Sequence, residues 1–331
     1  MQKNKSELRQ DLVSGDWIVI SPGRSKRPEQ LIKKPKKRKI ISKRGCPFEN
    51  SLENDGQKPI LIYGSGKKWE VWVVENKFPA FVCMGRCSVF SKTGPYLRGE
   101  AVGHHELVIT RDHYKNFAAL SHGKAQQVLE TFRDRYLALL NDKCISYVSI
   151  FHNWGPKAGA SIFHPHYQIA AIPVVPPDVN HSLEGSSRYF KKYKKCVHCV
   201  MMDYEIKNKK RILYENKGAV AFTPYVSKEP FEVRIFPKKH SPYFENAMDA
   251  DLDSITDALQ FTLRKIKKNL KDPDYNFFFH TASIKNKENY KHYHWHIEVI
   301  PKLHIAAGFE LSTGMEINAA DPDEAAKLLR E

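Results

Sequence analysis

Five short apolar stretches in the first half of the chain consist mostly of β-branched and aromatic residues, which is typical of β-strands. Between the third and the fourth stretch the apolar positions change to helical spacing. This pattern predicts strands with one long helix inserted among them. The predicted strands are Asp16 to Ile20, Trp69 to Val74, Leu107 to Thr110, Tyr147 to Phe151 and Tyr167 to Val174, and the helix carries Val128, Leu129, Phe132, Tyr136 and Leu139.

The second half repeats this plan. Residues 74–82 also resemble residues 214–222 in their letters, and residues 104–113 resemble residues 230–240. The predicted strands there are Ile212 to Glu215, Ala219 to Thr223, Phe231 to Phe236, Tyr275 to Phe279 and Trp295 to Ile300, with a helix carrying Leu252, Ile255, Leu259, Ile266 and Leu270.

Residues with metal-binding or catalytic side chains also recur in the same order. A cysteine is followed by a lone histidine and then by a His-x-His pair in each half, and the lone histidine precedes the pair by 51 residues in one half and 54 in the other. Matched order and spacing predict an internal duplication, with two unrelated α+β domains as the alternative. The two sets are Cys46, His113, His164 and His166, and Cys196, Cys199, His240, His294 and His296.

We therefore expect an α+β protein of two histidine-triad-like units, each an antiparallel sheet with packed helices. Pro173, Pro176, Pro177 and the segment Asn180 to Ser187 predict a connector without regular structure, because proline and glycine clusters disfavour helix and strand. The expected domains are residues 1–177 and residues 178–331. Asp321 is expected to cap a short C-terminal helix that Pro322 and the residues after it would form.

The chain has 331 residues, of which 41% are hydrophobic, so it can bury a substantial core. No uncharged apolar run approaches the length of a membrane span, and the charged N-terminus lacks an apolar segment behind it. These features predict a soluble, cytoplasmic protein. A formal charge of +16 predicts an anionic partner, either a phosphorylated small molecule or a nucleic acid. The basic run Lys33 to Arg44 is more typical of a solvated loop than of a nucleic-acid surface.

The six cysteines are not expected to form a disulfide framework, because no secretory signal is present. Cys196 and Cys199 form a C-x-x-C pair with metal-ligand spacing. Cys83, Cys87 and Cys144 are expected in the core because apolar or strand-like segments surround them.

The segment FHPHYQ contains the most informative group of polar residues. In a strand, His164, His166 and Gln168 would share one face, either as a buried structural row or as a catalytic group. The small, glycine-bearing loop from Asn153 to Ser161 just upstream can offer backbone N–H groups and a hydroxyl to phosphate. A neutral imidazole can attack phosphorus, and an amide at position 168 can donate a hydrogen bond without delivering a proton, which favours group transfer over hydrolysis.

These residues, together with the N-terminal segment from Asp16 to Pro28, resemble the galactose-1-phosphate uridylyltransferase family, a branch of the histidine-triad superfamily. The resemblance runs from about residue 8 to the C-terminus. It implies a homodimer and a ping-pong reaction, in which His166 attacks the α-phosphorus of a nucleoside diphosphate sugar. A hexose 1-phosphate leaves, and a second sugar phosphate or phosphate accepts the nucleotidyl group.

By matching position, the resemblance implies a role in substrate binding for several residues. Arg24 and Arg27 would hold phosphates, Asn76 and Phe78 would line the nucleoside pocket, and the α-phosphate would contact Asn153, Gly159, Ser161 and Gln168. The segment from Gly308 to Asn318 matches the stretch that contacts the hexose, with Phe309 and Glu310 as its candidate contacts. Phe309 replaces the usual tyrosine, and the pattern around it looks like the branch that includes ADP-glucose phosphorylase.

The resemblance also implies one or two zinc ions per chain. The first site would use Cys46, Glu49, His113 and His164, with Glu49 in the place of a cysteine, and the second would use Cys196, Cys199, His240 and His294. The rival to the second site is a different metal held by His280, His294, His296 and a carboxylate. His296 and Glu298 match His166 and Gln168, and a carboxylate there predicts a catalytically silent copy.

Three functional hypotheses follow. The first is UMP transfer between UDP-glucose and a hexose 1-phosphate, and the second is transfer of AMP from ADP-glucose to phosphate. The third is a zinc-stabilised protein that binds nucleic acid through its basic runs, in which the His-x-His rows are structural; this partner is the least expected. None of the three hypotheses involves a membrane.

Overall fold

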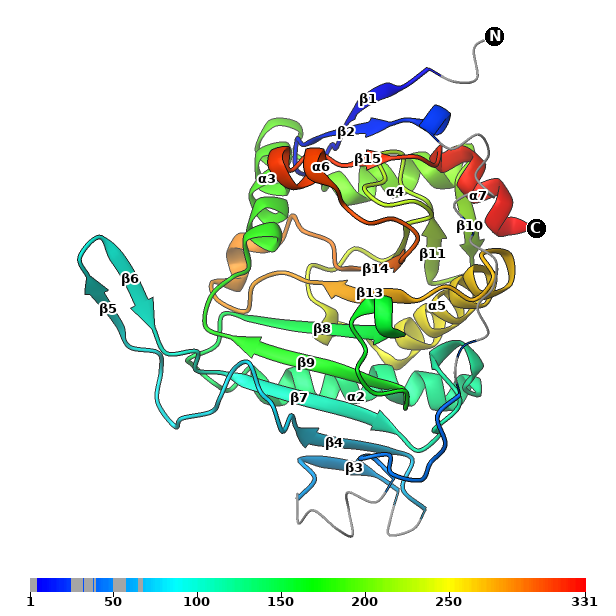
Figure 1. Ribbon diagram of the computed structural model, residues 1–331. Helices are drawn as coiled ribbons and strands as arrows, with labels where there is room; N and C mark the ends of the chain where they lie inside the picture. Colours follow the sequence, from blue (N-terminus) through cyan, green and yellow to red (C-terminus); the bar gives the residue numbers. More distant parts are fainter. Residues whose placement is uncertain (1–4, 25–31, 33–37, 39, 50–57, 65–67) are drawn as a thin grey trace.

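A single antiparallel sheet of ten strands forms the centre of the protein (Figure 1). The computed structural model describes residues 5–331 except residues 25–31, 33–37, 39, 50–57 and 65–67. Each half of the chain contributes five strands. In spatial order, they are β10 (Ile212–Glu215), β11 (Ala219–Phe222), β12 (Val233–Pro237), β14 (His296–Pro301), β13 (Tyr275–His280), β8 (Tyr147–Trp154), β9 (His166–Ile172), β7 (His104–Thr110), β4 (Val71–Glu75) and β3 (Leu61–Tyr63).

The two halves meet where β8 pairs with β13, with Tyr275 opposite Trp154 and Phe278 opposite Phe151. Counted outward from this seam, the strands of each half follow the same order along the chain. The expected α+β class with antiparallel strands is therefore confirmed. The two halves share one sheet. Their division into domains of residues 1–177 and 178–331 stays a prediction.

Two long helices cover one face of the sheet, which we call the helical face (Figure 1). They are α2 (His122–Leu139) and α5 (Asp249–Asn269), the two helices predicted from apolar spacing. Alternate strand residues such as Val73, Val108 and Tyr167 point into the main core with them. The residues between these, including Leu107 and Ile109, point to the opposite face, and His166 and Gln168 are paired with those two positions.

The opposite face of the second half is covered by helices and a small sheet. Helix α4 (Val197–Asn208) packs there through Met202 against Val220, Phe222 and Phe236. The small sheet has the order β1 (Glu7–Gln10), β2 (Trp17–Ile20) and β15 (Ile317–Asn318), and the C-terminal helices are α6 (Gly308–Thr313) and α7 (Pro322–Arg330). The expected cap of α7 is confirmed, since the Asp321 side chain accepts from the N–H groups of Asp323 and Glu324.

The expectation of an irregular connector after residue 173 is wrong, because α3 (Pro177–Tyr193) is a helix through most of it. Pro177 stands in the first turn, where a missing N–H costs nothing. Gly185 is required by packing: a Cβ there would lie 1.8 Å from the carbonyl oxygen of Val13. The glycine that suggested a break therefore lets the helix approach the N-terminal hairpin.

The hairpin of β5 (Phe90–Thr93) and β6 (Tyr96–Gly99) extends away from the sheet (Figure 1). Cys87, just before it, forms a disulfide with Cys144. Cys83 and Cys87 are exposed. The expectation of buried, unpaired cysteines at positions 83, 87 and 144 is therefore wrong, and the reason is that residues 83–99 leave the core.

Short 3-10 helices complete the connections between the elements. No helix in the described ranges is long and apolar enough to cross a membrane. The 3-10 segments are η1 (Pro22–Arg24), η4 (Phe117–Ala119), η5 (Pro156–Ala158), η6 (Phe244–Asn246) and η7 (Lys287–Tyr290).

Candidate functional site

His166 begins β9 and is 7% exposed. Its Nδ1 lies 2.9 Å from the carbonyl oxygen of His164, which can only accept, so Nδ1 carries the proton. The lone pair of the neutral ring is then on Nε2. Burial lowers the pKa of His166, and Phe48 packs edge-on against its ring at a centroid distance of 5.2 Å. These contacts keep an unprotonated, oriented nitrogen available at neutral pH.

Gln168 lies two residues further along β9 on the same face as His166. Its Oε1 is 2.9 Å from Nε2 of His105, a residue of β7. Asn76 lies beside this pair, with its amide nitrogen 3.3 Å from the same His105 nitrogen. The structure therefore brings Asn76, His105 and Gln168 together, while Phe78 is 89% exposed.

The loop after β8 makes two turns that require glycine, with φ of 87° at Gly155 and 89° at Gly159. Its backbone N–H groups are used within the protein. The Lys157 N–H donates to Asp274, and those of residues 158, 159 and 160 donate to loop carbonyls. The expectation that these backbone groups hold phosphate is therefore wrong for residues 157–160. The Asn153 amide and the exposed Ser161 hydroxyl are the loop's remaining candidate donors among the described residues.

Four predicted metal ligands converge behind the His166 motif. Nδ1 of His164 lies 3.2 Å from Nδ1 of His113 and 3.6 Å from Sγ of Cys46. Oε1 of Glu49 is 3.1 Å from His113 Nδ1 and 3.5 Å from His164 Nδ1. The ring Nε2 atoms of His113 and His164 face the backbone carbonyls of Ile41 and Thr110, so both Nδ1 lone pairs point at the same spot.

This first cluster fits a small cation. Tetrahedral bonds of about 2.3 Å to sulfur and about 2.0–2.1 Å to nitrogen would hold the ligand atoms roughly 3.5 Å apart, which is the spacing observed. Burial lowers the pKa of His164 to about 4, so a proton does not fill the gap between the two lone pairs at neutral pH. Glu49 Oε1 is buried without a hydrogen-bond partner, which a cation would correct.

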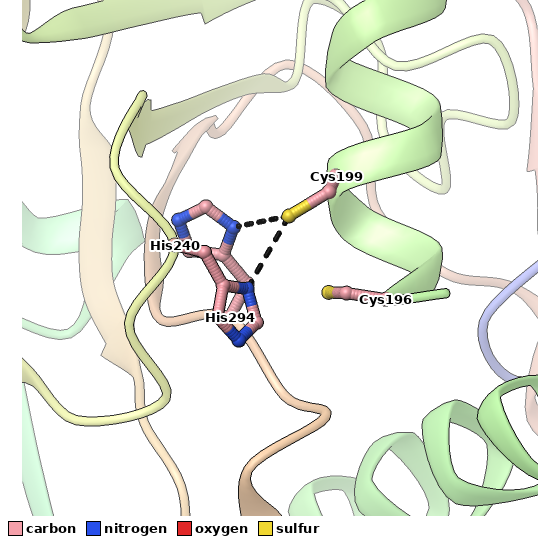
Figure 2. A group of neighbouring side chains, drawn as sticks. All are labelled: Cys196, Cys199, His240 and His294. Carbon is pink, nitrogen blue, oxygen red and sulfur yellow. Dashed lines mark hydrogen bonds between the residues drawn. The ribbon is translucent and has the colours of Figure 1, made fainter. Parts of the chain in front are cut away.

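The second cluster has two thiols and two imidazoles (Figure 2). Cys196 and Cys199 stand at the start of α4, and Sγ of Cys199 lies 3.3 Å from Nδ1 of His240 and 3.4 Å from Nδ1 of His294. All four ligand atoms lie within 4.8 Å of one another. Hydrogen bonding from Cys199 lowers the pKa of Cys196, which favours the thiolate that a metal needs.

In the second half, the residues that match His166 and Gln168 face charged side chains of the protein itself. His296 repeats the contact of His166, with Nδ1 3.1 Å from the His294 carbonyl oxygen. Its Nε2 faces Glu298 at 3.5 Å, and the Glu298 carboxylate lies 3.0 Å from Nε of Arg234 and 3.5 Å from His280. Catalytic silence of this copy stays a prediction.

Three residues that were predicted to bind substrate lie on elements away from the His166 strand, β9. Arg24 ends η1 beyond β2, and Phe309 and Glu310 belong to α6, which lies beside the small sheet and far from β9 in Figure 1. The Glu310 carboxylate accepts from the N–H of Ala307 and caps α6. Arg27 lies outside the described residues, and so does much of the basic run from residue 33 to 44.

Sequence reasoning missed four residues that touch the site residues. They are Phe48, His105, Asn276, and His152, whose Nδ1 donates to the His166 carbonyl oxygen at 2.8 Å. His105 could be predicted in part, since its place two residues before Leu107 in a strand puts it on the same side of the sheet as His166 and Gln168. Asn276 comes from the other half of the chain and gave no local signal.

Comparisons with known proteins agree with this fold. The family model described as galactose-1-phosphate uridyl transferase, N-terminal domain, matches residues 1–176, and a model described as a domain of unknown function (DUF4921) matches residues 89–330. ADP-glucose phosphorylase from Arabidopsis thaliana is 32% identical over 100% of this chain and 94% of its own length. Galactose-1-phosphate uridylyltransferase from Thermotoga maritima is 27% identical over 98% of both chains. A crystal structure of the A. thaliana ADP-glucose phosphorylase with bound ADP-glucose superimposes with a TM-score of 0.84 at 30% identity, covering 99% of each chain.

Proposed function

We propose that this chain, which belongs to the galactose-1-phosphate uridylyltransferase family, transfers AMP from ADP-glucose to phosphate through a covalent intermediate on His166. The geometry of His166 carries the proposal of nucleotidyl transfer, because its Nδ1–H is held by the His164 carbonyl and its Nε2 lone pair is left for attack. The full-length similarity to an ADP-glucose phosphorylase supports the choice of donor.

In the first step, Nε2 of His166 forms a bond to the α-phosphorus and the bond from that phosphorus to the bridging oxygen breaks. Glucose 1-phosphate leaves with the electron pair and needs no proton from the protein. The His166 ring becomes cationic, and its Nδ1–H bond to the His164 carbonyl stabilises that charge. In the second step, a phosphate oxygen attacks the same phosphorus, the N–P bond breaks, and ADP leaves.

The amides of Gln168 and Asn153 would donate hydrogen bonds to non-bridging oxygens as charge moves during each step. Phe48 and the strand pairing of β9 with β7 and β8 exclude water from one side of the His166 ring. Hydrolysis of the intermediate is then disfavoured relative to transfer to a bound acceptor.

We propose zinc as the metal of both clusters, because thiolate, imidazole and carboxylate ligands in tetrahedral spacing suit it. Zinc in the first cluster would be held by Cys46, Glu49, His113 and His164. It would fix the position of the His164 backbone carbonyl, which orients the His166 ring. The second site would hold the start of α4 to the segment after β12, through His240, and to the segment before β14, through His294.

A homodimer in the cytoplasm belongs to the same proposal. In Figure 1, α6, which carries Phe309 and Glu310, lies beside the small sheet and apart from β9, and Arg24 ends η1 just after β2, so a second chain would have to bring these residues to the sugar and phosphates. A reducing compartment would keep the three cluster cysteines, Cys46, Cys196 and Cys199, free of disulfides.

Transfer of UMP between UDP-glucose and a hexose 1-phosphate is the second candidate, supported by the similarity to the T. maritima uridylyltransferase. Steady-state assays with ADP-glucose and UDP-glucose, each with phosphate or galactose 1-phosphate as acceptor, separate the two. We expect the highest kcat/KM with ADP-glucose and phosphate. A preference of tenfold or more for UDP-glucose and a hexose 1-phosphate would favour UMP transfer instead.

A further inference from the structure

The two amides of the site, Asn153 and Gln168, each have their carbonyl oxygen bound by another side chain. An amide has a donor end and an acceptor end of nearly the same shape, so its usefulness depends on which end faces the ligand. Phosphoryl oxygens only accept hydrogen bonds. An amide that presented its oxygen to them would repel the charge that it should stabilise.

The orientation of Asn153 can be traced to a backbone carbonyl. Nδ2 of Asn276 donates to the carbonyl oxygen of Ala158 at 2.9 Å, and since that oxygen can only accept, the Asn276 atom must be the nitrogen. The same nitrogen lies 2.7 Å from Asn153, which must therefore present its Oδ1. The Asn153 Nδ2 is left pointing to the loop, where it lies 3.6 Å from the position that a Cβ on Gly159 would take.

The orientation of Gln168 can be traced to a backbone N–H. The Ala80 N–H donates to Nδ1 of His105 at 3.1 Å, so this nitrogen is unprotonated and the neutral ring carries its proton on Nε2. His105 Nε2 then donates to the atom of Gln168 at 2.9 Å, which must be Oε1. The Gln168 NH₂ group is left for a ligand.

We propose that Asn276 and His105 are positioning residues that fix both amides with their N–H groups toward the α-phosphate. This inference rests on the proposed function. Each works through a backbone group whose polarity cannot change, so the donor ends are set before the substrate arrives. Asn276 also makes the second half of the chain necessary for the catalytic geometry of the first half, because it reaches Asn153 and Ala158 across the β8–β13 seam.

The first test reverses one amide. In Asn276→Asp an oxygen replaces the donor, so Asn153 is expected to rotate its NH₂ toward it and turn its own oxygen to the phosphate. Loss of one such donor costs about 10²- to 10³-fold in rate, so adduct formation should fall at least about a hundredfold with the KM for the donor nearly unchanged. Asn153→Ala should slow adduct formation in the parent enzyme to a similar extent. Introduced into the Asn276→Asp variant, the same substitution should leave the rate unchanged or raise it.

Asn269→Asp is the matched control. Asn269 Nδ2, like that of Asn276, donates to two carbonyl oxygens, here the backbone oxygens of Leu328 and Leu329, but it lies at the end of α5. A loss of rate in Asn269→Asp equal to that of Asn276→Asp, after correction for unfolded protein by thermal denaturation, would mean a general structural effect. Additive losses for Asn153→Ala and Asn276→Asp would overturn the role of Asn276.

The second test is a double-mutant cycle of His105→Leu with Gln168→Ala. Each single variant should lose about 10²-fold in the rate of adduct formation, and the double variant should lose no more than Gln168→Ala alone. His104→Leu is the control, since the neighbouring His104 bonds to Asp142 instead of to Gln168. A full loss from His105→Leu in the Gln168→Ala background would overturn the role of His105.

Failure of the proposed function gives a different result. A folded, metal-loaded parent protein that forms no adduct from any donor would refute nucleotidyl transfer, and neutron diffraction would then decide the inference directly. Deuterons on the Asn153 and Gln168 nitrogens should lie on the sides away from Asn276 and His105. Deuterons facing those residues would overturn the inference.

Discussion

The glycine turns before Ser161 allow a graded test of how the loop supports the site. A Cβ on Gly155 would lie 2.1 Å from Oδ1 of Asp274 and 2.5 Å from a guanidinium nitrogen of Arg38, and φ at Gly155 is 87°. Gly159 has a similar φ of 89°, but its nearest neighbour would be the Asn153 amide at an ordinary 3.6 Å. The two sites share a positive φ but differ in ψ, which is 162° at Gly155 and 11° at Gly159, so they differ both in steric contact and in backbone conformation.

The left-handed backbone of Gly159 costs a non-glycine residue about 1–2 kcal/mol, and the backbone region of Gly155, which is essentially restricted to glycine, costs about 1–3 kcal/mol. Gly155→Ala must also displace Asp274, whose carboxylate accepts from the Lys157 N–H at 2.8 Å and pairs with Arg38 at 2.9 Å. A hydrogen bond to a charged group contributes about 1.5–3 kcal/mol, so the total for Gly155→Ala is about 3–5 kcal/mol. If that free energy opposes the ordered loop, adduct formation falls by roughly 10²-fold or more, against roughly tenfold for Gly159→Ala.

The assay is the single-turnover rate of adduct formation on His166, together with the free energy of unfolding from urea denaturation. Gly123→Ala is the control, because Gly123 lies in the first turn of α2 with nothing within 4 Å. It should leave the rate unchanged and can raise stability by up to about 1 kcal/mol. Equal effects for Gly155→Ala and Gly159→Ala would refute the reasoning from the Asp274 contact.

Three further predictions concern metal, charge and disulfide. Elemental analysis should show about one zinc fewer per chain in Glu49→Ala and in Cys199→Ser, each relative to the parent, and unchanged zinc in Glu49→Ala would exclude Glu49 as a ligand. Burial raises the pKa of Glu229 to about 7, so ionising this carboxyl destabilises the fold as pH rises from about 4.5 through 7. Glu229→Gln should match the parent in unfolding free energy near pH 4.5 and exceed it by about 1–3 kcal/mol at pH 8, and a constant difference between the two pH values would contradict this. Cys87→Ser removes the disulfide between residues 57 positions apart, and should lower the free energy of unfolding by up to about 4 kcal/mol without reductant. With reductant, the parent and the variant should be equally stable. A loss that persists with reductant would assign the effect to packing.

The main strands and helices could be predicted from the sequence because their spacing is a local property. The predicted Ile212 to Glu215 agrees with β10, and Tyr167 to Val174 differs from β9 by one residue at its start and two at its end. The same locality placed Gln168 on the face of His166, since residues two apart in a strand share a face, whereas His164 precedes β9 and lies outside the predicted row. The ligand sets of the two metal clusters were implied by the family resemblance, and the ligand atoms of Cys46, His113 and His164 and of the four second-cluster residues do converge.

The remaining features depend on contacts between distant segments. Gly185 reads as a helix breaker until the carbonyl of Val13 is seen beside it. The Cys87–Cys144 bond joins an exposed segment to a loop 57 residues away. The backbone groups of the loop from Gly155 to Ala160 looked available for phosphate because nothing local shows that Asp274 binds the Lys157 N–H.

The central claim is that His166 is the residue that carries the nucleotidyl group. Folded, zinc-loaded protein is incubated with ADP-glucose or UDP-glucose without acceptor, kept at neutral to alkaline pH, digested and mapped by mass spectrometry. We predict AMP or UMP on the peptide containing His166, lost on addition of phosphate or a hexose 1-phosphate and absent from His166→Ala. No adduct from either donor, or an adduct on His296 that persists in His166→Ala, would contradict the account.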